Sequence, residues 1–145
     1  MDHKSITLFC SMPLLYPEKH TSELQQRLTD TPDAWVLVCY CAAWCRTCAG
    51  FETAVEQFAR AHPDTICVWV DIEEHEDLLM DEDLEDLPTF ALQKGEQSFF
   101  YAPLPPMIEH LQRLSQQAEQ GLLPALGADD TPLFKQLLEQ RGSKP

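Results

Sequence analysis

Two apolar runs rich in β-forming residues constrain the fold of this chain more than any other feature of its sequence. The runs are Trp35–Ala42 and Ile66–Asp71, and each has the continuous hydrophobicity of a strand buried on both faces. Between them, apolar residues recur at helical spacing: Phe51, Val55, Phe58 and His62. Pro63 ends that segment. A strand, a helix and a strand in this order predict a βαβ unit, and therefore two parallel strands joined by a right-handed crossover.

Weaker signals predict elements on both sides of this unit. Before it, we expect a first strand at Ile6–Cys10 and a helix from Thr21 through Leu28 capped by Ser22. After it, we expect a hairpin of Thr89–Gln93 with Ser98–Tyr101. A helix opened by Pro105-Pro106 and a final helix between Thr131 and Gly142 complete the predicted elements. The hairpin turn falls at Lys94-Gly95-Glu96. One face of the helix after Pro106 carries Met107, Ile108, Leu111 and Leu114.

Length and hydropathy bound the class of protein. The chain has 145 residues, which fits one domain and is too short for a (β/α)₈ barrel. No stretch approaches the ~20 apolar residues of a membrane-spanning helix. The run Ile6–Tyr16 has the length of a signal-peptide core, but Pro13 interrupts it and no cleavage site follows. We therefore favour a strand there and expect a cytoplasmic protein.

The charge of the chain is strongly acidic and unevenly distributed. Its 10 Lys+Arg against 24 Asp+Glu give a formal net charge of −14. Ten of the acids lie between Asp71 and Asp86, and no Lys or Arg occurs between Arg60 and Lys94. Nucleic acid and anionic membrane surfaces repel such a chain, so we expect neither as a partner.

The clearest chemistry lies in the sequence Trp44-Cys45-Arg46-Thr47-Cys48. Cys45 and Cys48 follow a predicted strand and begin a predicted helix, and one helical turn brings their Cα atoms within disulfide range. The unpaired N–H groups and the dipole of a helix N-terminus favour a thiolate at Cys45. Arg46 adds a positive charge that should lower the pKa of Cys45 further. We therefore expect Cys45 to attack as the nucleophile and Cys48 to resolve the mixed disulfide.

The order of these motifs resembles the thioredoxin family. The match rests on Trp44-Cys-x-x-Cys48, Asp71, Leu87-Pro88-Thr89 and Lys94-Gly95-Glu96, and covers roughly residues 20–118. The resemblance implies an α/β thioredoxin-like fold, with a central mixed sheet flanked by helices. We expect this domain over residues 1–120 and a short C-terminal helical extension over residues 121–145, packed on or near it.

The family also implies an activity and a substrate site. We expect a thiol–disulfide oxidoreductase that reduces protein disulfides, needs no cofactor, and is regenerated by a thioredoxin-reductase-type or small-thiol donor. The bond before Pro88 is expected to be cis, with the backbone of Leu87 and the Trp44 indole lining the substrate groove. Arg46 and Thr47 are expected to modulate the dithiol.

Several residues depart from the family pattern. They are Cys39 for a buried aspartate, Cys67 for a lysine, Cys41 for a strand tryptophan, Ala102-Pro103 for Val-Gly, and Arg46-Thr47 for Gly-Pro. These changes affect the residues around the dithiol and leave Cys45 and Cys48 in place. They bear on the exchange rate, the redox potential and the choice of substrate.

Other interpretations of the same residues remain open. Cys39 and Cys67 occupy neighbouring positions in the family and would form a second redox pair. Cys41, Cys45 and Cys48 have the spacing of an iron–sulfur motif, although that motif needs a larger scaffold and a loop position for its first cysteine. The five histidines have no metal-ligand spacing, and His75 is expected on a solvated face, so no metal site is predicted. A non-catalytic binding module or chaperone would use the same fold without turnover. A redox sensor would use the dithiol to switch partners.

Overall fold

A mixed five-stranded sheet forms the centre of the molecule. The computed structural model describes residues 13–80, 84, 86–126 and 132–143. The strands are β1 (Leu14–Leu15), β2 (Trp35–Cys41), β3 (Ile66–Asp71), β4 (Thr89–Lys94) and β5 (Gln97–Pro103). Their order in the sheet is β1-β3-β2-β4-β5. β3 runs parallel to β1 and β2, and β4 runs antiparallel to β2 and β5, which confirms the predicted parallel pair and the hairpin.

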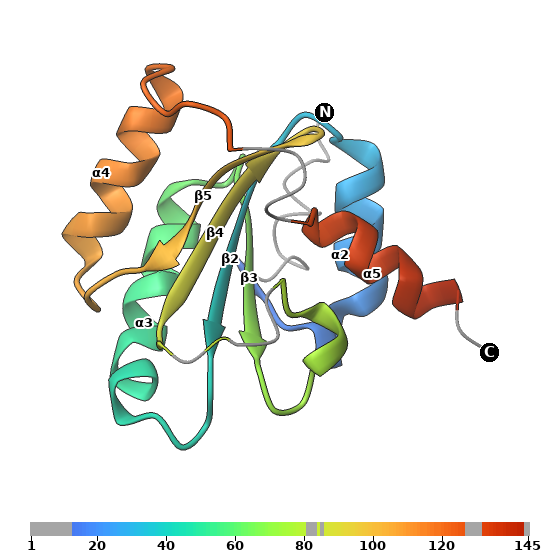
Figure 1. The fold of residues 1–145 in the computed structure, drawn as a ribbon, viewed down its shortest axis with the longest axis horizontal. Coiled ribbons are helices and arrows are strands. Elements are labelled where there is room, and N and C mark those ends of the chain that lie inside the picture. The colour runs from blue at the N-terminus through green and yellow to red at the C-terminus, as the bar shows by residue number, and fades with distance from the viewer. Residues whose placement is uncertain (1–12, 81–83, 85, 127–131, 144–145) are drawn as a thin grey trace.

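Helices cover both faces of this sheet. They are α2 (Pro17–Asp30), α3 (Arg46–Ala61), the 3₁₀ turn η1 (Glu76–Leu78), α4 (Ile108–Glu119) and α5 (Phe134–Ser143). Figure 1 shows α3 and α4 on one side of the strands and α2 and α5 on the other. The expected α/β architecture with a central mixed sheet and flanking helices is confirmed.

The sheet divides the core into two apolar layers. Successive side chains of a strand point to opposite faces, and β2 therefore contributes to both layers. Leu37, Cys39 and Cys41 face the layer of α3 and α4. Val36, Val38 and Tyr40 face the layer of α2 and α5. This double burial explains why the sequence of β2 is continuously apolar.

The N-terminal elements differ from the prediction in their bounds. Ile6–Cys10 lies outside the described residues, and the first described strand is the short β1 at Leu14–Leu15. α2 begins at Pro17 with Tyr16 as its N-cap, so the expected cap at Ser22 is wrong. Proline fits the first helical position, because its missing N–H has no partner there in any case. His20 has non-helical φ and ψ angles, which kinks α2 shortly before Ser22.

The start of α4 also differs from the prediction. Pro105 and Pro106 precede the helix, and the extended Met107 is its N-cap. The Met107 side chain is 52% exposed, so its expected place on the apolar face is wrong. Leu111 and Leu114 are buried as predicted.

The C-terminal helix packs on the α2 face of the sheet. α5 begins at Phe134, and the expected start at Thr131 lies outside the described residues. Phe134 and Leu138 are buried in the same layer as Leu24 of α2. Gln93 of β4 is buried and donates hydrogen bonds to Ser98 Oγ (2.7 Å) and to the carbonyl of Pro132 (2.9 Å). The division of the chain at residue 120 stays a prediction.

Candidate functional site

The two cysteines of the dithiol lie at the junction of β2 and α3. Cys45 has extended backbone angles and is the N-cap of α3. Its N–H donates to the carbonyl of Ala42 (3.0 Å), and its carbonyl accepts from the N–H of Ala49 (3.1 Å). Cys45 is half-buried, whereas Cys48, one turn into the helix, is 1% exposed. The expected placement of both residues at a strand-to-helix junction is confirmed, and their roles stay predictions.

The helix N-terminus lowers the pKa of the Cys45 thiol below its ordinary value of 9.0. The largest cause is the backbone N–H of Cys48, and the Cys48 thiol and the N–H of Thr47 add to it. Burial opposes the shift only in part. Peptide N–H groups of the helix start therefore stabilise the Cys45 thiolate. The expected contribution of Arg46 to this pKa stays a prediction.

The Cys48 thiol is held in its protonated form. Burial raises its pKa above the ordinary value of 9.0, and the neighbouring Cys41 and Cys45 thiols raise it further. A half-buried thiol with a lowered pKa therefore lies one helical turn from a buried thiol with a raised pKa. This is the arrangement that thiol–disulfide exchange requires.

Cys39 and Cys41 form a buried sulfur contact behind the dithiol. Both point to the α3 side of β2, and their Sγ atoms lie 3.7 Å apart. Burial raises the pKa of Cys39, and the hydrogen bond with Cys39 together with burial raises that of Cys41. The Cys48 thiol is near enough to Cys41 to affect its pKa as well. The sulfurs thus follow one another from Cys39 through Cys41 and Cys48 to Cys45.

Cys67 lies apart from this row. In the parallel register Cys67 faces Leu37, while Cys39 faces Trp69. Burial raises the pKa of Cys67 to about 12. The Cys39 sulfur contacts Cys41, and the structure gives no sulfur contact for the alternative pair of Cys39 with Cys67. The iron–sulfur interpretation required Cys41 in a loop, and Cys41 is a strand residue.

The Leu87-Pro88 loop lies beside the end of β2. The peptide bond between Leu87 and Pro88 is cis, as the family resemblance implied. β4 begins at Thr89, which pairs with Tyr40, so Pro88 comes next to the residue at which β2 ends. Pro88 is buried, and its carbonyl accepts the N–H of Leu104 (3.3 Å). Leu87 is half-buried and packs on the same apolar cluster as Cys45, which places both at one end of the sheet.

Trp44 connects the site to the acidic segment. Its indole is 63% exposed, and Nε1 donates a 2.8 Å hydrogen bond to Oε2 of Glu73. Asp71 Oδ1 accepts the N–H of Glu73 (2.9 Å) and thereby orients the turn after β3. Glu73 was not among the predicted site residues, because within the acidic run nothing in the sequence distinguishes it from its neighbours.

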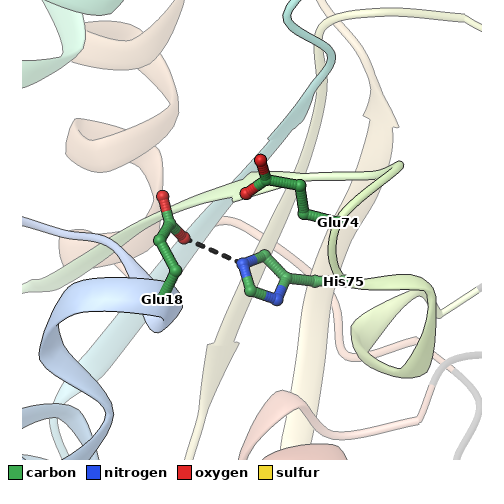
Figure 2. A group of neighbouring side chains, drawn as sticks. All are labelled: Glu18, Glu74 and His75. Carbon is green, nitrogen blue, oxygen red and sulfur yellow. Dashed lines mark hydrogen bonds and ion pairs between the residues drawn. The ribbon is translucent and has the colours of Figure 1, made fainter.

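A second group of polar side chains includes Glu74 and His75, which follow Glu73 in the turn after β3, here called the acidic turn. His75 is 6% exposed, so its expected place on a solvated face is wrong. Its Nε2 lies 2.8 Å from Oε1 of Glu18, at the start of α2, and Figure 2 shows the two side chains pointing toward one another with Glu74 beside them. One ligand atom from each of the three residues lies within 4.8 Å of the others, so the group has the donors of a small cation site. The His75–Glu18 contact links α2 to the acidic turn, and this structural role explains why the side chains lie together.

Curated proteins with similar sequences are thioredoxins or contain a thioredoxin domain. Thioredoxin-T of Drosophila melanogaster is 28% identical over 83 residues, which are 57% of this chain and 53% of that protein. The thioredoxin of Geodia cydonium is 29% identical over 77 residues, which are 53% of this chain and 73% of that protein. Thioredoxin domain-containing protein 2 of Mus musculus is 33% identical over 79 residues, which are 54% of this chain and only 15% of that protein. The chain thus aligns with about half of the first of these proteins and a small part of the last.

Solved thioredoxin structures have the same fold. Thioredoxin NaTrxh from Nicotiana alata superposes with a TM-score of 0.57 at 17% identity, over 72% of this chain and 91% of that one. A thioredoxin variant from Halobacterium salinarum gives a TM-score of 0.57 at 24% identity, over 72% of this chain and 90% of that one. In the described part of the chain, the helices are too short or too polar to cross a membrane. The sequence model of the family named Thioredoxin matches residues 15–103, and this chain therefore belongs to the thioredoxin family.

Proposed function

We propose that this protein is a thiol–disulfide oxidoreductase that reduces disulfide bonds in other proteins. One observation carries the proposal: the half-buried Cys45 has a lowered pKa, and the buried Cys48 thiol adjoins it with a raised one. This asymmetry gives the two thiols different parts in one reaction. The family membership of residues 15–103 supports the same chemistry.

The reaction proceeds in two exchanges. The Cys45 thiolate attacks one sulfur of the substrate disulfide, forms a mixed disulfide and releases the other substrate sulfur as a thiolate. Cys48 then loses its proton and attacks Cys45, which releases the second substrate thiol and leaves a Cys45–Cys48 disulfide. Two electrons pass from the protein to the substrate. The N–H groups of Cys48 and Thr47 stabilise Cys45 as the attacking thiolate in the first exchange.

The surroundings of the dithiol suggest how a substrate binds. Leu87 offers its backbone beside Cys45, and the exposed Trp44 indole offers an apolar surface. The Trp44–Glu73 hydrogen bond brings the acidic turn next to this indole. We therefore propose that the surface around Cys45 selects neutral or basic polypeptide segments and repels acidic ones. A thioredoxin-reductase-type enzyme or a small thiol in a reducing compartment such as the cytoplasm would restore the dithiol.

Turnover with a disulfide-containing protein tests this function. The wild-type protein should accelerate the reduction of insulin by dithiothreitol, and Cys45→Ser should abolish the acceleration. Cys48→Ser should accumulate a mixed disulfide with the substrate, because Cys45 attacks but nothing releases the product. Cys67→Ser, a change away from the dithiol, serves as the control and should retain activity. Equal rates for the wild-type protein and Cys45→Ser would contradict the proposal and favour a non-catalytic binding module.

A further inference from the structure

Cys41 is a buried thiol that the proposed reaction does not use. It is the last residue of β2 and is 1% exposed. Its sulfur lies 3.7 Å from the Cys39 sulfur, and it shares the buried cluster on the α3 face with Cys48, whose thiol is near enough for each to affect the pKa of the other. Cys48 thus has two thiol neighbours, Cys45 toward the surface and Cys41 toward the core.

The closeness of Cys41 and Cys48 has a consequence for the oxidised protein. Cys41 ends β2 and Cys48 lies in the first turn of α3, so a bond from Cys48 to Cys45 does not require either backbone to move away from the other. Disulfide exchange needs a third sulfur close to one sulfur of the disulfide. Cys41 at the end of β2 provides this sulfur for Cys48 at the start of α3, and no long loop has to close to bring the two together. Both elements are held in the packed apolar cluster on the α3 face of the sheet.

We propose that Cys41 is a second partner for Cys48, and that the disulfide formed at Cys45–Cys48 moves inward to become Cys41–Cys48. The inference rests on the proposed function, because that activity supplies the first disulfide. It assigns Cys41 a place in the redox chemistry, in addition to its place in the core.

The transfer is an internal exchange that needs no added oxidant. The Cys41 thiol loses its proton to solvent, and its sulfur attacks the sulfur of Cys48. The Cys45–Cys48 bond breaks, and its electron pair remains on Cys45, where the N–H groups of Cys48 and Thr47 stabilise the thiolate. Two sulfurs are oxidised before and after the step. Because the Cys41 thiol is buried and hard to ionise, the transfer is slower than the formation of Cys45–Cys48.

The inward disulfide changes what Cys45 does next. Cys45 is again a free thiolate, but its resolving partner is held by Cys41. A second attack by Cys45 then gives a mixed disulfide that Cys48 cannot resolve until the inward bond is undone. The protein therefore has two oxidised forms. The Cys45–Cys48 form has already released its target, whereas the Cys41–Cys48 form can hold a target covalently through Cys45.

Differential alkylation of the wild-type protein follows the disulfide as it moves. Reduced protein is oxidised with equimolar diamide and quenched with acid at increasing times. Free thiols are blocked with one maleimide, the disulfides are reduced, and the new thiols are blocked with a heavy maleimide. Trypsin cleaves after Arg46, so Cys48 falls on a separate peptide, and fragment spectra distinguish Cys41 from Cys45 on the other.

The two outcomes are distinct. We expect the heavy label first on Cys45 and Cys48, and then a rise at Cys41 matched by an equal loss at Cys45, while Cys48 stays labelled. If the heavy label stays on Cys45 and Cys48 at all times, the transfer does not occur and the inference is overturned. The proposed function survives that outcome, since it needs only the first pair.

Cys45→Ser tests the inner pair on its own. After oxidation it should give a disulfide that joins the peptide of Cys41 to the peptide of Cys48, and the double variant Cys41→Ala with Cys45→Ser should not. Cys67 should carry no heavy label in either protein, which controls for random oxidation. Circular dichroism shows whether each variant is folded. A folded Cys45→Ser protein that forms no Cys41–Cys48 bond overturns the inference, even if the wild-type protein lacks activity.

Discussion

The side-chain oxygen of Gln93 accepts a 2.8 Å hydrogen bond from the backbone N–H of Phe134, the first residue of α5. The same amide donates through Nε2 to the carbonyl of Pro132 (2.9 Å), so one buried side chain satisfies two backbone groups of the C-terminal segment. Phe134 itself is fully buried against the α2 face of the sheet. The extension therefore shares a core with the strands it covers.

We expect Phe134→Ala to lower the free energy of unfolding by about 3–5 kcal/mol, because it removes a buried aromatic side chain and leaves a cavity. Urea denaturation followed by far-ultraviolet circular dichroism measures the loss. Lys135→Ala is the matched control in α5. It breaks only the partly exposed Lys135–Glu96 ion pair and should cost less than about 1 kcal/mol. Equal losses for the two variants would contradict the packing described for α5.

The reactivity of Cys45 should depend on pH with a midpoint below 9.0, because its pKa is lowered and the thiolate is the reactive form. Alkylation by iodoacetamide should therefore be slow at acidic pH, rise through the midpoint and then level off. Cys48, whose pKa is raised, should not react in the same range. Mass spectrometry of the alkylated peptides gives both rates. A midpoint at or above 9.0 for Cys45 would contradict the stabilisation by the helix start.

Thr47→Pro should raise that midpoint by up to about one pKa unit, because proline lacks the N–H that hydrogen-bonds to the Cys45 thiolate. Proline is tolerated in the first helical turn, so the fold should persist. Arg46→Ala should shift the midpoint less than Thr47→Pro, because backbone N–H groups are the main cause of the lowered pKa of Cys45. The same alkylation profile measures both variants. A larger shift for Arg46→Ala than for Thr47→Pro would show that the charge of Arg46 outweighs the N–H of Thr47.

Glu73→Ala should weaken substrate binding about two- to fivefold, because Trp44 loses the acceptor of its indole N–H. The KM for a peptide disulfide should rise while kcat stays unchanged. Glu73→Gln keeps an acceptor oxygen and removes the charge, so it separates the hydrogen bond from the electrostatics. If both variants change KM equally for a neutral peptide, the charge of Glu73 and not its contact with Trp44 is responsible.

His75→Ala should lower the free energy of unfolding by about 1–3 kcal/mol, because it removes a buried side chain that ties the acidic turn to Glu18 of α2. Glu74→Gln, at an exposed neighbouring position, should stay within about 0.5 kcal/mol of the wild-type protein. Denaturant midpoints provide the comparison. A stronger effect at Glu74 than at His75 would show that the histidine is not the structural member of the group.

Local patterns in the sequence predicted the elements that carry the dithiol. Continuous hydrophobicity identified β2 and β3, because both strands are buried on two faces, and the strand-to-helix change placed Cys45 at a helix start. Helix bounds were less accurate. Ser22 was a poor cap prediction, because α2 already begins at Pro17, and Met107 was assigned to an apolar face although it precedes the helix.

Contacts between distant segments were beyond the reach of sequence patterns. Glu18 and His75 are 57 positions apart, and only the packing of α2 against the turn after β3 brings them together. The Trp44–Glu73 bond likewise depends on how two loops meet. The contact between Cys39 and Cys41 had a signal, because residues two apart on a strand share a face. The resemblance to the thioredoxin family drew attention instead to Cys67 as a neighbour of Cys39.

Side chains on the two faces of β2 contribute to different parts of the protein. Cys39 and Cys41 face the layer that holds the dithiol, whereas Val38 and Tyr40 face the layer that receives α5. All five described cysteines belong to or pack against the first layer. Substitutions at neighbouring positions of β2 therefore have different effects. Those on one face change the surroundings of the sulfurs, and those on the other face change the packing of the C-terminal helix. Redox behaviour and the attachment of α5 can thus diverge independently as the sequence varies.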